Sequence, residues 1–248
     1  MRSLATRHPA NPQLMHVGIN MGRDFAVGDL HGSFGALQQA LDSIGFVAGQ
    51  GRLFSVGDLV DRGPESDQVL DWLDRPWFHA ICGNHDFMVW RTALGDPFPE
   101  VNFLDHGGTW FNALNPDQQR RVGERLAALP LAIEVQPPQG LVGLVHADCP
   151  CDDWHDMQNQ ALSASAQHYC LWSRKRIQRG DVSPVRNVRA VIHGHTTMVR
   201  MQTLGNVFFI DTGGWRPGHG HFTFVELHSL DVIQGPAPAA ALAPRRFF

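Results

Sequence analysis

Three short apolar runs mark the first part of the chain, and each leads into a glycine, a polar cluster and then a helical pattern. The runs cover 25–27, 53–56 and 78–82, and the helical patterns that follow cover 33–44, 66–73 and 87–94. Parallel strands that are covered on both faces form unbroken apolar runs instead of alternating ones. The order therefore predicts three successive β-turn-α units with parallel strands. In such a sheet, ligands collect beyond the carboxyl ends of the strands, where the polar clusters fall.

The pattern changes in the second part of the chain. A helix is predicted from Pro116 onward, because Val122, Leu126 and Leu129 share one of its faces. The predicted strands that follow cover 131–135, 141–145, 188–192, 207–210 and 222–227. Between them, residues 148–183 are polar and mixed and predict helix and loop. The alternation of strands and helices indicates an α/β fold.

Length and composition suit one domain of this kind. The chain has 248 residues, of which 43% are hydrophobic, and this is enough for a large core. We expect a flexible leader over 1–22, one domain over 23–233 and a tail over 234–248.

Charge and cysteine content bear on partners and compartment. A net charge of −4 gives no reason to expect nucleic acid or an acidic membrane surface as a partner. The chain has neither a membrane-spanning apolar run nor the apolar core of a signal peptide, so we expect a cytoplasmic protein. The spacing of Cys82, Cys149, Cys151 and Cys170 is not that of a disulfide framework, although Cys149 and Cys151 leave a zinc site as an alternative. The oligomeric state is unknown from sequence.

The turns after the predicted strands carry oxygen and nitrogen ligands for metal ions. Asp29 and His31 stand two residues apart in a glycine-bounded turn, a spacing that lets both side chains reach one ion. Asp58 ends the next strand and can bridge two ions through its two carboxylate oxygens. The amide oxygen of Asn84 suits a hard ion such as Mn²⁺ or Mg²⁺.

Two histidines at the ends of later strands complete this set. His146 and His195, each taken alone, are also typical of a core or loop histidine. Together with the residues of the earlier turns, they supply the nitrogen ligands that a second ion needs. His219 and His221 form a loop pair, for which a third metal site is a minor alternative.

Three neighbouring residues suit the chemistry of a phosphate ester. Arg62 can make a bidentate contact to phosphoryl oxygens, with a surface ion pair as the alternative. His85 directly follows Asn84, and a histidine held by a carboxylate is a common proton donor. Asp61 is the carboxylate that we expect to hold His85.

The polar clusters form an ordered set of motifs. They are G-D-L-H-G at 28–32, G-D-L-V-D-R-G at 57–63, G-N-H-D at 83–86, H-A at 146–147 and G-H-T at 194–196. In this set the chain resembles the PPP family of metal-dependent phosphoprotein phosphatases, and more closely its bacterial and bacteriophage-lambda-type serine/threonine branch. The resemblance runs from about Asp24 to Gly213. It implies a calcineurin-like metallophosphoesterase fold, in which two mixed β-sheets stack and helices flank them.

The resemblance also implies a role for each matched residue. The first metal ion would be bound by Asp29, His31 and Asp58, and the second by Asp58, Asn84, His146 and His195. Mn²⁺ is the expected ion, with Fe, Zn²⁺ and Mg²⁺ as alternatives. Arg62 would bind phosphate, and His85, oriented by Asp61, would be the acid. The family has a second phosphate-binding arginine after the H-A motif, for which Arg174 is the candidate and Arg176 the alternative.

We therefore expect a phosphomonoesterase with two divalent metal ions that acts on phosphorylated proteins or peptides. The expected reaction is that of a serine/threonine phosphatase, by direct attack of a metal-bound hydroxide. A phosphotyrosine preference stays open, since it depends on the loops around 148–173. One alternative is a symmetrical bis(5'-nucleosyl)-tetraphosphate hydrolase, although such hydrolases typically carry alanine in place of Asp61 and tryptophan in place of Thr196. A non-catalytic metal-bound scaffold is a remote alternative, because no ligand and no acid histidine is missing here.

Overall fold

Two β-sheets form the centre of the molecule in the computed structural model, which describes residues 14–18, 20, 22–96, 103–160 and 163–238. The six-stranded sheet has the order β1 (Leu14–Val17), β5 (Ala132–Val135), β6 (Val142–Val145), β7 (Ala190–His193), β9 (Val207–Phe209) and β8 (Gln202–Leu204). The five-stranded sheet has the order β11 (Val232–Gln234), β10 (Thr223–Glu226), β2 (Asp24–Val27), β3 (Arg52–Ser55) and β4 (Phe78–Ala80). Both sheets are mixed.

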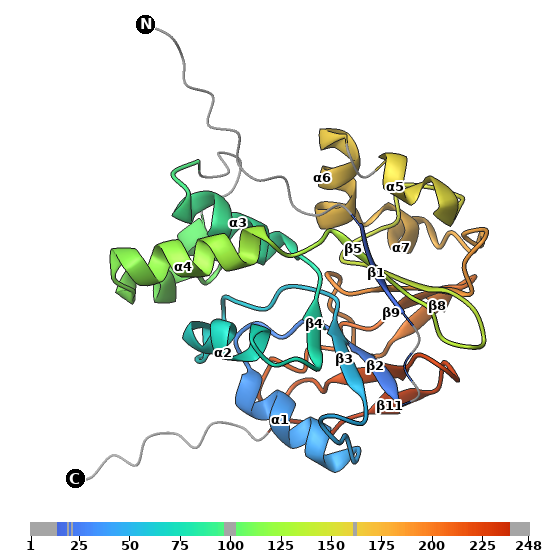
Figure 1. Ribbon diagram of the computed structural model, residues 1–248, viewed down its shortest axis with the longest axis horizontal. Coiled ribbons are helices and arrows are strands. Elements are labelled where there is room, and N and C mark those ends of the chain that lie inside the picture. The colour runs from blue at the N-terminus through green and yellow to red at the C-terminus, as the bar shows by residue number, and fades with distance from the viewer. Residues whose placement is uncertain (1–13, 19, 21, 97–102, 161–162, 239–248) are drawn as a thin grey trace, which may run out of the picture.

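Helices cover the outer faces of both sheets. Those near the five-stranded sheet are α1 (Phe34–Ser43), α2 (Val69–Leu73), α3 (Asn84–Ala93) and α4 (Pro116–Ala127). Those near the six-stranded sheet are α5 (Met157–Gln160), α6 (Ala164–Trp172) and α7 (Lys175–Arg179), and the two groups lie on different sides of the molecule (Figure 1). Short 3₁₀ helices are η1 (Ser66–Gln68), η2 (Phe103–His106), η3 (Gly108–Ala113) and η4 (Trp154–Asp156).

The core has three apolar clusters that match these layers. Between the sheets, Phe54 and Val56 of one sheet pack with Leu144 and Ile192 of the other. A second cluster joins the outer face of the five-stranded sheet to α1, α2, α3 and α4, and a third joins the six-stranded sheet to the segment with Trp154 and α6. The predicted fold of two stacked mixed sheets flanked by helices is confirmed.

The three predicted β-turn-α units are present. Strands β2, β3 and β4 run parallel in that order, and each leads through a turn to α1, to η1 with α2, and to α3. The predicted strands 131–135, 141–145, 188–192, 207–210 and 222–227 correspond to β5, β6, β7, β9 and β10. The predicted helix from Pro116 is α4, whose first turn is closed by reciprocal bonds between Asn115 and Gln118.

The predicted boundaries need correction at both ends. The flexible leader expected over 1–22 is wrong for residues 14–17, which form β1 and pair in parallel with β5. Met15 and Val17 pack against the apolar cluster between the sheets, and this burial outweighs the weak local pattern. Gln234 belongs to β11, so the expected tail begins inside a strand. Residues 1–13 and 239–248 lie outside the described part of the chain.

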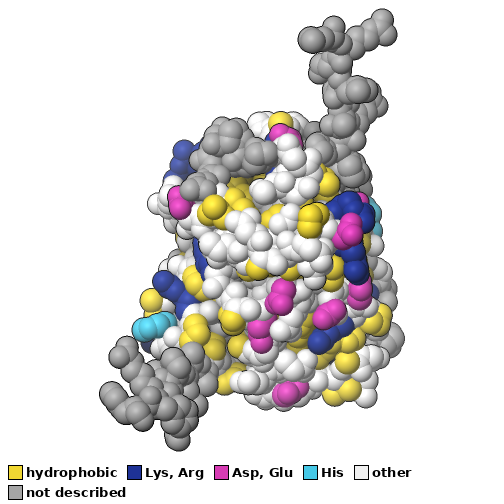
Figure 2. Space-filling model, turned by 90° about the vertical axis from the view of Figure 1, so that its left-hand side faces the viewer, with side chains coloured by type: hydrophobic (Ala, Val, Ile, Leu, Met, Phe, Trp, Pro, Cys, Tyr) yellow, Lys and Arg dark blue, Asp and Glu magenta, His cyan; other side chains and the backbone are white. Residues whose placement is uncertain are grey.

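The surface carries charges of both signs. On the face shown in Figure 2, acidic and basic side chains of the described residues are interspersed with apolar ones, and neither sign forms one continuous patch. This agrees with the small net charge of −4. None of the helices that the structure describes is long and apolar enough to cross a membrane.

Candidate metal centre

The carboxyl ends of strands from both sheets meet at one buried cluster of polar side chains. Turns after β2, β3 and β4 and the ends of β6 and β7 supply its members, namely Asp29, His31, Asp58, Asp61, Asn84, His85, His146 and His195. Each of these residues is at most 7% exposed. The structure therefore brings together the residues that the sequence motifs single out.

Backbone strain is concentrated at this cluster. Seven non-glycine residues of the described chain have a positive φ, and five of them belong to the predicted site: His31, Asp58, Asp61, Arg62 and His195. Left-handed backbone at side-chain-bearing residues costs free energy and persists where the surroundings enforce it. Gly83 allows the close approach, because a Cβ there would collide with the backbone nitrogen and carboxylate of Asp58.

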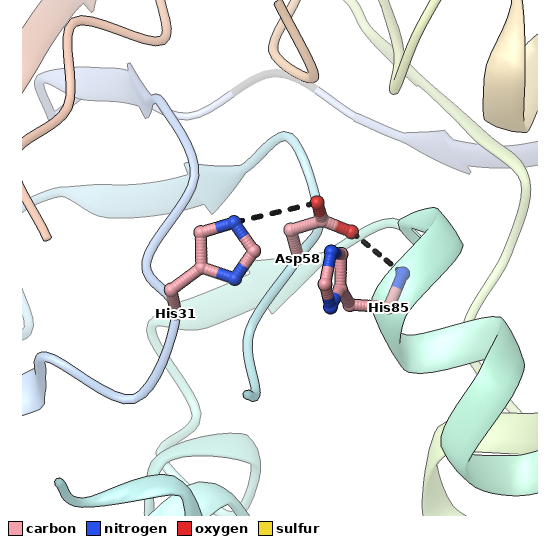
Figure 3. A group of neighbouring side chains, drawn as sticks. All are labelled: His31, Asp58 and His85. Carbon is pink, nitrogen blue, oxygen red and sulfur yellow. Dashed lines mark hydrogen bonds and ion pairs between the residues drawn. The ribbon is translucent and has the colours of Figure 1, made fainter. Parts of the chain in front are cut away.

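One group of potential metal ligands surrounds Asp58 on the five-stranded sheet. The ligand atoms of His31, Asp58 and His85 lie within 4.8 Å of one another. His31 Nε2 is 3.6 Å from Asp58 Oδ2 and 4.0 Å from Asp29 Oδ2. The backbone N–H of His85 donates to Asp58 Oδ1 over 2.9 Å, and Figure 3 shows both contacts of Asp58. Asp29 thus lies at the edge of this group.

The tautomer of His31 suits metal binding. Its Nδ1 donates to the carbonyl of Val60 over 3.0 Å, which leaves the lone pair on Nε2 facing the carboxylates. An N–H group of Arg62 donates to this same Nε2 over 2.8 Å. Burial, followed by the charges of His85 and Arg62, outweighs Asp58 and holds the pKa of His31 well below its usual range. The imidazole is therefore neutral, as a ligand must be.

A second group joins Asp58 to histidines of the other sheet. The ligand atoms of Asp58, His146 and His195 lie within 4.8 Å of one another. Asn84 Oδ1 is 2.9 Å from His146 Nε2 and 2.8 Å from His195 Nδ1. His146 Nε2 is also 3.3 Å from Asp58 Oδ1. Asp58 is common to both groups, the position that a bridging carboxylate takes between two ions.

The donor atoms of the second group favour a cation. His146 Nδ1 donates to the carbonyl of Val56 over 2.7 Å. When the ring is neutral, its Nε2 therefore carries a lone pair, and this lone pair faces the lone pairs of Asn84 Oδ1. Burial opposes a charge on His146, yet the Asp58 carboxylate outweighs it and raises the pKa of His146. His195 Nε2 is buried without a hydrogen-bond partner among the described residues, and burial lowers the pKa of His195 to about 2.

The carboxylates show the same preference for a cation. Burial, then Asp211 and Asp58, raises the pKa of Asp29 well above its usual range. Burial opposes ionisation of Asp58 as well, but the charges of His146 and His85, together with the hydrogen bond from His146, outweigh it and hold the pKa of Asp58 well below the usual range. Crowded buried carboxylates are stable as ions only beside positive charge. The oxygen and imidazole donors of the two groups therefore fit a pair of divalent ions.

His85 and Asp61 form a buried pair at the edge of the cluster. His85 Nδ1 donates to Asp61 Oδ2 over 2.7 Å, and an N–H of Arg62 donates to His85 Nε2 over 3.0 Å. Burial raises the pKa of Asp61, although its bonds to His85 and Trp110 oppose this. The second oxygen of Asp61 accepts a bond from Trp110 Nε1 over 2.7 Å. The pair thus holds the His85 ring in one orientation.

The structure separates the two candidate arginines. Arg176 is 7% exposed, and its guanidinium donates to the carbonyls of Asp181 and Ser183 over 3.0 and 2.7 Å. Arg174 instead approaches the site, with Nη2 3.5 Å from the carbonyl of His195. Arg62 lies over the ring of Trp215, 4.8 Å from its centroid, and contacts both His31 and His85.

Sequence reasoning missed three residues that support the site. Trp110 lies in η3, away from any strand end, and no local signal marks it. Asp86 accepts bonds from the backbone N–H groups of Leu59 and Gly83 and so ties two of the turns together. Asp211 follows β9 and accepts bonds from Thr197 and Gly213. Asp211 ends an apolar run, as Asp29 and Asp58 do, but it lacks the glycine that directly precedes those two residues, so the signal at Asp211 is weaker.

The minor metal alternatives find no support. The metal-binding groups of the described residues include neither His219 nor His221, which line a separate surface cavity. They also include no cysteine. Cys149 and Cys151 are free and buried, with sulfur atoms 3.5 Å apart.

A stacked pair of mixed sheets with such a cluster at its strand ends defines a metal-dependent hydrolase. Residues 25–198, more than half of the chain, match the family model described as calcineurin-like phosphoesterase, and the chain belongs to this family.

Named relatives extend the comparison. The chain is 32% identical over 212 residues to serine/threonine-protein phosphatase 2 of Escherichia coli (strain K12), a match that covers 82% of this chain and 92% of that protein. It is 42% identical over 112 residues to the symmetrical bis(5'-nucleosyl)-tetraphosphatase of Chromobacterium violaceum, but this covers only 44% of this chain and 39% of the relative. The fold resembles a serine/threonine phosphatase structure from Saccharomyces cerevisiae with a TM-score of 0.62 at 16% identity, covering 95% and 86% of the two chains.

Proposed function

We propose that the protein is a two-metal phosphomonoesterase that removes phosphate from phosphoserine and phosphothreonine in proteins. One observation carries this proposal: Asp58 belongs to both groups of potential ligands, at the meeting point of the two sheets. The relative named serine/threonine-protein phosphatase 2, matched over 82% of this chain, supports the substrate class. Phosphorylated proteins or peptides are thus the proposed partners.

Two sets of residues would hold the ions. Asp29, His31 and Asp58 would bind the first, and Asp58, Asn84, His146 and His195 would bind the second. When bound, the ions supply positive charge that polarises the phosphate ester and lowers the pKa of water. A mixed oxygen and imidazole set suits Mn²⁺, which we propose over Fe, Zn²⁺ and Mg²⁺. The buried free cysteines suit a reducing compartment, which supports a cytoplasmic location.

The arginines and His85 would act on the phosphate ester itself. Arg62 and Arg174 lie on different sides of the cluster, and their planar donors suit the phosphoryl oxygens. His85 would give a proton from Nε2 to the leaving oxygen, because its Nδ1 is held by Asp61. The buried Asp61 carboxylate would stabilise the protonated ring, which it contacts at 2.7 Å.

The test compares substrates on one metal-loaded sample. After stripping with a chelator and reloading with Mn²⁺, initial rates are measured on phosphoserine, phosphothreonine and phosphotyrosine peptides and on diadenosine tetraphosphate. Faster turnover of the phosphoserine or phosphothreonine peptides is expected. A preference for phosphotyrosine would change the residue specificity, and no turnover with two ions bound would favour a scaffold.

A second candidate is hydrolysis of a bis(5'-nucleosyl) tetraphosphate. The 42% identity to the Chromobacterium violaceum enzyme favours this second function, but only over 112 residues. This match covers 44% of this chain and 39% of that enzyme, whereas the match to serine/threonine-protein phosphatase 2 covers 82% of this chain and 92% of that protein. Faster turnover of the dinucleotide in the same assay would establish this second function.

A further inference from the structure

A cavity of about 390 Å³ lies next to Arg174 on the surface formed by α6 and α7. Its lining residues are His168, Tyr169, Trp172, Ser173, Arg174, Lys175 and Gln178. All of them come from one continuous segment, so a single helix-turn-helix shapes the cavity. We call it the α6–α7 cavity.

The walls of the α6–α7 cavity combine aromatic rings with positive charge. His168 stacks on Trp172 with ring centroids 6.3 Å apart, and Lys175 Nζ lies 5.2 Å from the centroid of Tyr169. The lining contains two cationic side chains, Arg174 and Lys175, and no acidic one. No carboxylate of the described residues forms an ion pair with either cation. Lys175 is also the only lysine of the chain.

The same segment reaches the candidate metal centre. Trp172 contacts His195 edge-on with ring centroids 6.5 Å apart, and Arg174 Nη2 is 3.5 Å from the His195 carbonyl. Arg174 therefore stands between the centre and the α6–α7 cavity. A ligand whose phosphate is bound by Arg174 would therefore lie next to the cavity that Lys175 also lines.

We propose that the α6–α7 cavity binds an anionic side chain that flanks the phosphorylated residue of a protein substrate. Lys175 is then a specificity-determining residue that contacts this anion, and Tyr169 and Trp172 hold the peptide between them. An extended peptide advances about 3.3–3.6 Å per residue, so a carboxylate or second phosphate one or two positions away reaches the neighbour of Arg174. The inference rests on the proposed phosphatase function and names a class of substrate for it.

The expected selectivity is modest, because Lys175 is exposed to solvent. Contacts between exposed opposite charges favour a bound state by about two- to fivefold. We therefore expect kcat/KM to be two- to fivefold higher for a phosphoserine peptide with a flanking glutamate than for its alanine counterpart. The preference should fade in 1 M salt, where the screening length is about 3 Å.

The experiment measures this ratio for the Mn²⁺-loaded protein and two variants. Peptides carry one phosphoserine with a flanking alanine, glutamate or second phosphoserine. Lys175→Met removes the charge and keeps the aliphatic stem, and the ratio of glutamate to alanine peptide should fall to about one. Arg179→Met is the matched control, because it removes the same charge from α7 outside the cavity lining and should keep the wild-type ratio.

The peptide series also separates the two sources of the anion. A larger gain from the second phosphoserine than from glutamate would identify multiply phosphorylated segments as the preferred ligand, and the reverse would identify acidic segments. Either result supports the site if Lys175→Met abolishes it.

Three results would overturn the assignment. Equal turnover of all peptides by the wild type would show that the α6–α7 cavity does not discriminate between charged and neutral flanking side chains. An equal loss in the Arg179 variant would assign the effect to overall charge. A Lys175 variant that slows only diadenosine tetraphosphate would assign the cavity to a polyphosphate chain. Failure of the proposed function looks different, because no phosphopeptide would then be turned over at all.

Discussion

The two sheets contribute different chemistry to one site. The five-stranded sheet supplies Asp29, His31, Asp58 and Asn84 from turns that follow one another along the chain. The six-stranded sheet supplies only imidazoles to the proposed ligands, from the ends of β6 and β7. In the proposed ligand set, the carboxylates therefore come from one sheet, and the nitrogens that would complete the ligands of the second ion come from the other.

The two halves are also held together differently. Backbone N–H groups of Leu30 and His31 donate to the carbonyl of Asp58 over 3.1 and 2.8 Å, so the turns of the five-stranded sheet support one another directly. Across the sheets, His146 Nδ1 donates to the Val56 carbonyl and the backbone N–H of His195 donates to Asp29. The turns of the five-stranded half are thus held by backbone bonds, while the two halves are aligned with each other through side chains. Bound ions would strengthen that alignment.

The largest loss of metal binding and of rate is expected from a change at Asp58, where the two halves meet. Asp58→Asn removes the charge that both ligand groups share, so binding of both ions should be lost. Losing a general acid alone costs about 10²–10⁴-fold in rate, and losing both ions should cost at least the upper end of that range. Metal content per chain, measured after dialysis, should fall from two ions to none.

Asp24→Asn is the control for this variant. Asp24 is a buried aspartate of the same sheet, paired with Arg52 at the other end of β2. Its replacement should lower stability but leave two ions per chain. An Asp58 variant that still bound two ions would rule out the shared ligand.

The next largest effect is expected from loss of the proposed proton donor, which belongs to the five-stranded half. His85→Asn removes the proposed donor, so phenyl phosphate and phosphoserine should slow by about 10²–10⁴-fold. The leaving group of p-nitrophenyl phosphate departs without a proton and should slow much less. Steady-state rates on the three substrates check this, and equal losses on all of them would remove His85 from the acid role.

A smaller loss of rate is expected from a residue that contacts Asp61 and not His85 itself. Trp110→Phe keeps an aromatic ring but removes the bond to Asp61 Oδ1, so Asp61 would hold His85 less firmly. Loss of such supporting contacts typically costs about 10–100-fold, and we expect about tenfold with the poor leaving groups and less with p-nitrophenyl phosphate.

The chain offers a matched control for this bond. Trp154 Nε1 donates to a carboxylate oxygen of Glu134 over 3.0 Å, away from the site. Trp154→Phe removes the same kind of bond and should leave the ratio between leaving groups unchanged. If both variants shifted this ratio alike, Trp110 would have only a structural role.

The contrast between the halves also explains what the sequence could predict. Asp29, Asp58 and Asn84 follow apolar strands in a repeated local pattern, so their convergence at one sheet edge follows from parallel pairing. His146 and His195 also end predicted strands, but outside the repeated strand-turn-helix pattern, so their place in the site follows only from the whole set of motifs.

Other features depend on packing over long sequence distances. Trp110 reaches Asp61 across 49 positions, and no periodicity encodes that contact. Strand β1 is recruited by pairing with β5, far along the chain, so its four residues look unstructured when taken alone. The difference between Arg174 and Arg176 is more local, because the Arg176 guanidinium donates to carbonyls five and seven residues along the chain, in a loop that no periodic pattern encodes.

Metal removal should also have an effect on stability, which is measured separately from the rate. Each ion that binds only the folded chain at about 100 times its Kd adds about 2.7 kcal/mol, so two ions add about 5.4 kcal/mol, and about 2–4 °C of Tm follows from each kcal/mol in a chain of this size. Chelation of both ions should therefore lower Tm by about 10–20 °C in thermal unfolding. Asp58→Asn should show no such difference, because it would bind neither ion. A similar loss of Tm in that variant would mean that the ions stabilise the protein elsewhere, and that the six-stranded half is aligned without them.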